Sequence, residues 1–244
     1  MKVLLAIPLT ILFYFVFVFL LVFFHFIQLV VYHLGGYEAH KRSVDLLNVC
    51  LLQSLKILGT KISVSGLENL PENRSIIVAS NHQSMMDIPP IIWLLRAHHM
   101  KFIAKKELSR GVPSISFNLQ KGGSLLIDRK KGKETKVQMM EYASKLAEKG
   151  HSVCIFPEGT RSRTGKLKEF KAGGLVSLVT ASPGTPVVPF LVDGNYKIFQ
   201  DGFFPLNIGQ TVNYQVLPPI LSGEVQPEMI ASLVRSRIEN ALPY

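Results

Sequence analysis

The chain has 244 residues, 48% of them hydrophobic and 18% charged, and this length favours one domain with one sizeable core. Its two cysteines, Cys50 and Cys154, lie in apolar settings at no metal-ligand spacing, so we expect free thiols and a reducing compartment. The net charge is +10, and residues 101–171 alone hold 17 basic and 7 acidic residues. A basic surface of this kind suits nucleic acid, anionic lipid or a phosphorylated substrate.

Residues 3–34 contain no Asp, Glu, Lys or Arg. A continuous helix of this length would be about 48 Å long, against a hydrocarbon core of roughly 30 Å. We therefore expect it to bend, end or surface at Pro8, His25, Gln28 or the Gly35-Gly36 pair. A secretory signal has an apolar core of only about 7–15 residues and a small-residue cleavage site. The segment is better interpreted as a retained anchor.

Residues 44–58 form a second predicted helix, with Leu47, Leu51 and Leu55 on one face and Gly59 in C-cap position. This helix suits either a membrane surface or the core of the soluble domain. Residues 1–59 are therefore predicted to be a membrane-anchoring segment of two helices.

Two arrangements of that segment remain open. The helices could form a hairpin in one leaflet, or the first could span the bilayer. Lys41 and Arg42 after the long segment outnumber Lys2 before it, so a spanning helix would keep the body of the protein on the cytoplasmic side. We expect a membrane-associated protein whose active site faces the cytoplasm, with a bacterial cytoplasmic membrane favoured.

Residues 60–244 alternate short apolar runs with helical patterns. This alternation predicts an α/β domain with a mixed, largely parallel sheet flanked by helices. The expected strands are 61–65, 76–79, 100–104, 124–127, 152–156, 187–192 and 211–217, and the expected helices are 88–95, 134–149, 173–181 and 227–242.

The stretch 81–87 joins the expected strand 76–79 to the expected helix 88–95. Ser84 is a plausible N-cap, and Asp87 three residues later completes a capping-box pattern. His82 would leave the strand end just before the helix begins, so the imidazole and the Asp87 carboxylate can touch across the corner. A carboxylate bound to one ring nitrogen leaves the other nitrogen able to take a proton from a hydroxyl. Read alone, most such pairs are a capped helix and a surface imidazole.

Two arginines follow other apolar strands, Arg129 in the stretch 123–129 and Arg161 in the stretch 156–162. Sites in open α/β sheets gather at the carboxyl ends of strands, so these groups could share one crevice with His82. A general base beside arginines suggests an alcohol acceptor that carries phosphate. Basic residues without interleaved aromatic residues argue against nucleic-acid binding, and the His/Asp pair lacks the further ligands of a metal site.

In this order the stretches resemble the motifs of the glycerolipid acyltransferase family, most closely its 1-acylglycerol-3-phosphate (lysophosphatidate) branch. The resemblance runs from about residue 61 to residue 195. The matching residues are Asn81, His82, Ser84 and Asp87 of N-H-x-S-x-x-D, Gly123 and Ile127 to Arg129 of the I-D-R motif, Phe156 to Ser162 of F-P-E-G-T-R-S, Val188-Pro189, and Lys105 to Leu108 of the K-x-E-L segment. Phe190 and Asp193 are less typical of the fourth motif.

The resemblance implies that His82 is the base and Asp87 its orienting partner, supported by Asn81 and Ser84. It also implies a glycerol-phosphate site formed by Glu158, Gly159, Thr160, Arg161, Arg129 and Lys105.

The implied reaction transfers a fatty acyl group from acyl-CoA or acyl carrier protein to the sn-2 hydroxyl of lysophosphatidate, without metal or cofactor. Anionic membrane lipids are expected partners. Two alternatives remain open: acyl transfer to another lysolipid, such as a lyso-ornithine lipid or lysophosphatidylethanolamine, and a non-catalytic membrane tether.

Overall fold

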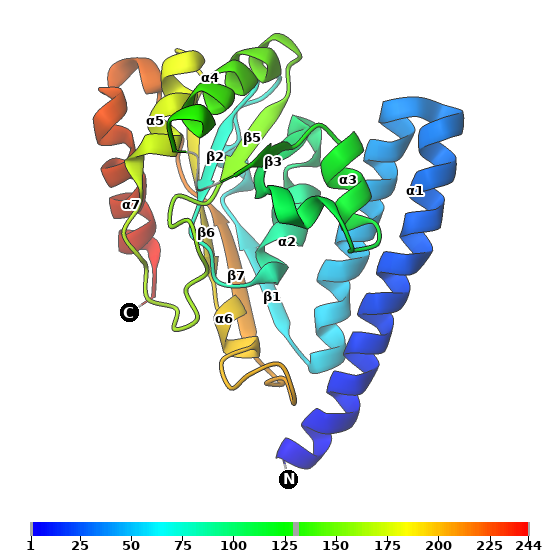
Figure 1. Cartoon of the computed structure of the whole chain (residues 1–244). Helices are drawn as coiled ribbons and strands as arrows, with labels where there is room; N and C mark the ends of the chain where they lie inside the picture. The colour runs from blue at the N-terminus through cyan, green and yellow to red at the C-terminus, as the bar shows by residue number, and fades with distance from the viewer. Residues whose placement is uncertain (1, 129–131, 244) are drawn as a thin grey trace.

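The computed structural model describes residues 2–128 and 132–243, and within these residues seven strands form one sheet in the order β1-β7-β6-β2-β5-β3-β4 (Figure 1). Each strand lies within one residue of the bounds expected from the sequence. The strands are β1 (Lys61–Ser65), β2 (Ile77–Ser80), β3 (Met100–Lys105), β4 (Leu125–Ile127), β5 (Ser152–Ile155), β6 (Val187–Asp193) and β7 (Thr211–Val216).

The sheet is mixed and largely parallel, which confirms the expected α/β class. Neighbouring strands from β6 through β2, β5 and β3 to β4 are all parallel, whereas β7 is antiparallel to β6 and parallel to β1. The carboxyl ends of β2, β5, β3 and β4 therefore lie along one edge of the sheet. Ala79 pairs with Ile155, and Lys105 pairs with Ile127.

Helices cover both faces of the sheet. Val78 of β2 belongs to a core shared with α1 and α2, whereas Ile77 and Ala79 belong to a core shared with α4, α5 and α7 (Figure 1). Alternating side chains of one strand thus enter two cores, and β2 is fully buried. The helices after α1 are α2 (Ile88–Leu94), α3 (Ile115–Lys121), α4 (Gly132–Glu148), α5 (Ala172–Ala181), α6 (Asn195–Ile198) and α7 (Ile230–Ala241).

Three details of the helices differ from the expectation. The short helices α3 and α6 were not expected, because seven and four residues are too few to show a helical period. The expected helix 227–242 begins as a 3-10 turn, Pro227–Met229, before α7.

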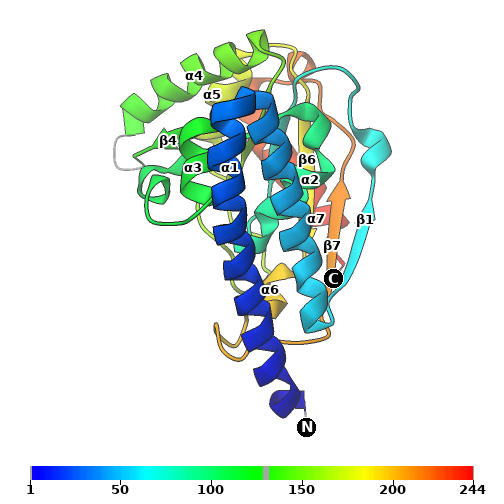
Figure 2. The ribbon, with the colours of Figure 1, turned by 90° about the vertical axis from the view of Figure 1, so that its right-hand side faces the viewer.

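The N-terminal segment is a helical hairpin, α1 (Lys2–Ser54), whose two arms run antiparallel (Figure 2). The chain reverses at Gly36, where φ is 66° and ψ is −156°, a conformation almost confined to glycine. The two helical arms joined at the Gly35-Gly36 pair confirm the expected helical segment, but the second arm starts directly after this turn and not at residue 44. A 3-10 turn, Leu55–Leu58, ends the hairpin, and Gly59 caps it in the left-handed conformation as expected.

Pro8, His25 and Gln28 do not interrupt the first arm. The His25 Nδ1 accepts a hydrogen bond from the Ser114 N–H at 3.1 Å, and Gln28 is fully buried. These polar residues face the body of the protein, so the segment needs no break to accommodate them.

The other side of the first arm is apolar and exposed. By length and composition, Val3–Leu58 is the stretch of the described chain that could cross a membrane. Exposed apolar side chains in a continuous row are typical of a surface that contacts lipid or another protein, and this row indicates membrane association. The most exposed are Val3, Leu4, Leu5, Ile11, Phe15, Val18, Phe19, Phe26, Val30 and Leu34.

Candidate active site

His82 lies in the loop that follows β2. Ser84 caps the 3-10 turn Met85–Asp87: its backbone is extended and its Oγ accepts the Met86 N–H at 3.0 Å. The Ser84 N–H donates to Asp87 Oδ2 at 2.9 Å, which completes the expected capping box. The turn leads directly into α2 and directs the Asp87 carboxylate back toward the strand end.

His82 and Asp87 form a hydrogen-bonded pair. The His82 Nδ1 lies 2.7 Å from Asp87 Oδ2, which also accepts the Gln83 N–H at 2.6 Å and the Ser84 N–H. A carboxylate oxygen in this position assigns the imidazole proton to Nδ1 and leaves Nε2 as a proton acceptor. The Asp87 side chain is fully buried, whereas 16% of the His82 side chain remains accessible. The pair therefore has the geometry of an oriented base with a route to solvent.

Asn195, which the sequence did not reveal, bonds the other Asp87 oxygen, and Tyr214 in turn holds Asn195. The Asn195 Nδ2 donates to Asp87 Oδ1 at 2.7 Å, and the Tyr214 hydroxyl donates to Asn195 Oδ1 at 2.9 Å. Burial, with the Asp87 charge as a smaller cause, raises the pKa of Tyr214, so the phenol keeps the proton that it donates. The only feature of the sequence that could have indicated this role of Asn195 was its position just after the expected strand 187–192.

The loop after β5 is tied to both backbone groups of His82. The His82 N–H donates to Glu158 Oε1 at 2.8 Å, and the Ser162 N–H donates to the His82 carbonyl at 2.7 Å. The Phe156 ring stacks on the imidazole, with 4.1 Å between the ring centroids and 23° between the planes. The loop thus fixes both the backbone and the ring of His82.

Glu158 occupies a buried position inside this loop. Its Oε2 accepts the Lys168 N–H at 3.3 Å, so its two oxygens join the backbones of two segments. Burial raises the pKa of Glu158, and its backbone hydrogen bonds from His82 and Lys168 partly offset this shift. In the structure both carboxylate oxygens of Glu158 accept backbone hydrogen bonds, and its expected contact with the acceptor stays a prediction.

The expected phosphate-binding cations lie along the same edge of the sheet. Arg161 and Thr160 are exposed, and Arg161 immediately precedes Ser162, whose N–H bonds His82. Gly159 has a φ of 72°, which sets the sharp turn before them. Lys105 is exposed at the carboxyl end of β3. Arg129 lies outside the described residues.

The backbone N–H groups nearest to His82 in the two loops are already engaged within the protein. The Gln83 and Ser84 N–H groups donate to Asp87, and the Met86 N–H donates to Ser84 Oγ. The Gly159 N–H donates to the Phe156 carbonyl at 3.0 Å. We therefore assign none of these four groups to an oxyanion.

Asn81 joins the loop after β2 to β6. Its Nδ2 donates to the Val192 carbonyl at 2.7 Å, and its Oδ1 accepts the Val192 N–H at 2.8 Å. The buried side chain thus bonds both backbone groups of Val192, as the backbone of a neighbouring strand would. It fixes where the loop that carries His82 leaves the sheet.

Two further features bear on the chemistry of the site. A cavity of about 210 Å³ lies near the carboxyl ends of β3 and β4, with Lys106, Leu126 and Thr135 in its wall. Within residues 2–128 and 132–243, no group of three or more His, Cys, Asp or Glu side chains is placed to hold a metal ion.

Comparison with known proteins identifies the family. The sequence model of the family described as Acyltransferase matches residues 61–193, which is more than half of the chain and includes His82, Asp87 and Arg161. The chain therefore belongs to the Acyltransferase family, and it is an enzyme that transfers acyl groups.

Individual relatives carry more specific names. A 1-acyl-sn-glycerol-3-phosphate acyltransferase from Borreliella burgdorferi is 29% identical over 82% of this chain and 79% of that protein. A chloroplastic protein of the same activity name from Brassica napus is 36% identical over 58% of this chain, but over only 40% of its own length. The crystal structure of the LPA acyltransferase PlsC from Thermotoga maritima has a TM-score of 0.74, with 24% identity and 97% coverage of both chains, and shows the same fold.

Replacing Asn81 tests how the loop is anchored. Asn81→Leu should lower the free energy of unfolding by about 2 kcal/mol or more, because it leaves the buried Val192 N–H and carbonyl unpaired. Urea denaturation in detergent would measure this, with Asn240→Leu on the exposed side of α7 as the control. Equal stability of the two variants would contradict the anchoring role.

Proposed function

We propose that this enzyme transfers a fatty acyl group from an acyl thioester to the sn-2 hydroxyl of lysophosphatidate, forming phosphatidate for phospholipid biosynthesis. The observation that carries the proposal is the 2.7 Å contact between His82 and the fully buried Asp87. The names of the relatives, which refer to 1-acyl-sn-glycerol-3-phosphate, support the choice of acceptor. We also propose that the chain divides into a membrane-anchoring segment, residues 1–59, and an acyltransferase domain, residues 60–244.

In the proposed mechanism, His82 Nε2 takes the proton of the sn-2 hydroxyl while the hydroxyl oxygen bonds to the thioester carbonyl carbon. The Asp87 carboxylate stabilises the resulting imidazolium. The tetrahedral intermediate then loses the thiolate as the C–S bond breaks, and the imidazolium returns its proton to that thiolate. General base catalysis typically contributes 10²–10⁴-fold to a rate, so the positioning of the two substrates must supply much of the rest.

We propose that the enzyme positions the acceptor by binding its phosphate group. Arg161 is the leading candidate, because its neighbour Ser162 is hydrogen-bonded to the backbone of His82. An arginine can hold a phosphate through two parallel hydrogen bonds, which fixes orientation as well as distance. Lys105, Arg129 and Thr160 are proposed as further contacts at this edge.

The proposed donor is acyl-CoA or acyl-ACP, used as a substrate, and the reaction needs no cofactor. Exposed basic residues such as Lys166 and Lys168, near Arg161 in the chain, could bind the phosphates of coenzyme A or the acidic surface of a carrier protein. The same residues suit anionic membrane lipids, where each cation contributes about 1 kcal/mol near the surface.

The helical hairpin gives the acceptor a route to the site. Lysophosphatidate and phosphatidate carry long acyl chains and reside in a bilayer. An apolar hairpin anchored in the membrane would hold the site near headgroup depth, so the acceptor need not be lifted into water. We propose that the site faces the cytoplasm.

The base role is tested by His82→Ala. We expect kcat to fall at least about 100-fold with little change in the acceptor KM, because only the proton acceptor is lost. His33→Ala, which removes an exposed imidazole on α1, is the control and should retain full activity. A turnover number unchanged in a folded His82→Ala enzyme would exclude the base role.

The phosphate role is tested by Arg161→Ala. The acceptor KM should rise at least about tenfold, since a charge-assisted hydrogen bond contributes roughly 1.5–3 kcal/mol. Arg163→Ala is a matched control, because Arg163 is exposed two residues further along the same loop. If both variants stayed within about twofold of wild type, Arg161 would be a solvated surface cation.

The substrates are tested by an assay that crosses acyl-CoA and acyl-ACP with several lysolipids. We expect transfer to lysophosphatidate with at least one donor. Transfer to a lyso-ornithine lipid or lysophosphatidylethanolamine, but not to lysophosphatidate, would keep the chemistry and overturn the acceptor. No transfer to any lysolipid would overturn the proposed reaction.

A further inference from the structure

A second group of ionisable side chains lies at the opposite edge of the sheet, where the hairpin turn meets the strands. Lys101 is the second residue of β3, and His151 immediately precedes β5. Tyr37 follows the turn at Gly36, and His40 lies on the second arm of α1. With Ser124 before β4, these residues surround the amino ends of three strands, away from His82.

Lys101 is a buried ammonium without a carboxylate partner. Its side chain is only 5% exposed, its Nζ donates to the Tyr37 hydroxyl, and it lies 4.6 Å from the centroid of the Tyr37 ring. Among residues 2–128 and 132–243, no Asp or Glu oxygen lies within ion-pair distance of it. Asp45, the only acidic residue in the pocket wall, is paired with Lys41 at 2.6 Å.

The charge of Lys101 persists at neutral pH. Burial, and next the charge of Lys41, lower the pKa of Lys101 to about 8, whereas Asp45 and Glu38 raise it. An ammonium with this pKa still carries its proton at pH 7 in most molecules. The pocket therefore holds an incompletely compensated positive charge, which is costly for a protein to bury.

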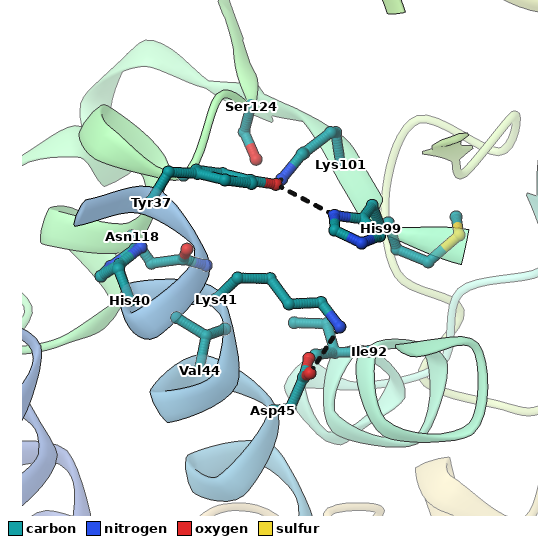
Figure 3. A pocket seen from close by; sticks show the side chains of 12 residues that line it. Tyr37, His40, Lys41, Val44, Asp45, Ile92, His99, Lys101, Asn118 and Ser124 are labelled. Carbon is teal, nitrogen blue, oxygen red and sulfur yellow. Dashed lines mark hydrogen bonds and ion pairs between the residues drawn. The ribbon is translucent and has the colours of Figure 1, made fainter. Parts of the chain in front are cut away.

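Several of the surrounding side chains can donate hydrogen bonds. Figure 3 shows Lys101 and His99 meeting at the Tyr37 hydroxyl, with Lys41 directed toward Asp45. His40 is fully buried, and neither of its ring nitrogens has a hydrogen-bond partner.

Two more donors lie close to the ammonium. Ser124 Oγ accepts the Phe102 N–H at 3.2 Å, which leaves its own O–H available, and Asn118 of α3 also lines the pocket. The pocket is partly open to solvent and has a volume of about 20 Å³, enough for one oxygen-sized atom. Because Lys41 is paired with Asp45, the charge without a carboxylate partner is that of Lys101, and donors around it suit an anionic oxygen.

We propose that this pocket binds a phosphate group, with one oxygen enclosed beside Lys101 and Ser124 and the remainder at the open mouth. The phosphate could belong to a soluble ion or to a lipid headgroup, since Leu34, just before the hairpin turn, is 84% exposed and apolar. Because the pocket wall comes from α1, β3 and α3, a bound phosphate would join the hairpin turn to the sheet.

The site is tested by a calorimetric titration of the full chain, in detergent, with inorganic phosphate. The Arg161→Ala background weakens the proposed acceptor site, so that a change caused by a pocket variant can be assigned to the second site. In this background we expect saturable binding that Lys101→Met weakens at least about tenfold, since the hydrogen bond to a charged group is lost. Lys61→Met, at an exposed position on β1, should bind as the background does.

If Lys101→Met does not fold, a second variant still tests the site. Ser124→Ala retains the ammonium and should weaken phosphate binding about threefold or more. Absence of saturable binding up to about 10 mM phosphate, or binding unaffected by either pocket variant, would overturn the site whatever the acceptor site does.

Vesicle binding identifies the source of the phosphate. If the ligand is a lipid headgroup, Lys101→Met should weaken binding to phosphatidylglycerol vesicles several-fold more than Lys61→Met does. If the ligand is a soluble phosphate, the two variants should bind vesicles equally, while inorganic phosphate binding still depends on Lys101. A pocket that holds only water would show dependence on Lys101 in neither measurement, and the proposal would fail.

Discussion

The site depends on one buried carboxylate. Asp87 accepts hydrogen bonds from the His82 ring, from two backbone N–H groups of its own turn, from the Ser84 hydroxyl and from Asn195. A charge this deep in a protein is stable only when its oxygens are well supplied with donors. The same bonds close the turn before α2 and orient the imidazole, so the fold of this corner itself sets the position of the His82 ring.

Much of this corner could be predicted because its determinants are local in the sequence. The capping box and the His82–Asp87 pair lie within seven residues, and the apolar runs of the strands are short and uninterrupted. Asn195 is 108 residues from Asp87, and Tyr214 lies beyond it, so no local pattern joins them. Their role follows from the position of β6 beside β2, which the strand pattern did not specify.

In the N-terminal hairpin, the breaks predicted from single polar residues do not occur, and the reason is physical. His25 and Gln28 looked like breaks because polar groups are costly in a continuous membrane helix. In the structure they face the protein, and His25 bonds to the segment before α3, a helix too short to be expected. The glycine turn was predictable because its backbone conformation selects the residue directly.

The excess positive charge also has a more specific arrangement than the sequence indicated. Residues 101–171 suggested one basic surface, but Lys101 is buried at the amino edge of the sheet, whereas Lys105 and Arg161 are exposed at the carboxyl edge. Two lysines four positions apart on one strand, Lys101 and Lys105, thus lie in two separate positive environments. The net charge of a segment does not show this division, because a strand carries its ends to opposite edges.

The double attachment of His82 to the loop after β5 has a consequence for relatives of this enzyme. Both backbone hydrogen-bonding groups of His82 are used by residues of that loop, one through Glu158 and one through Ser162. A chimaera that receives this loop from another family member would also exchange the residues that hold the backbone of His82. Such an exchange should leave the imidazole in place only where the incoming loop keeps both hydrogen bonds.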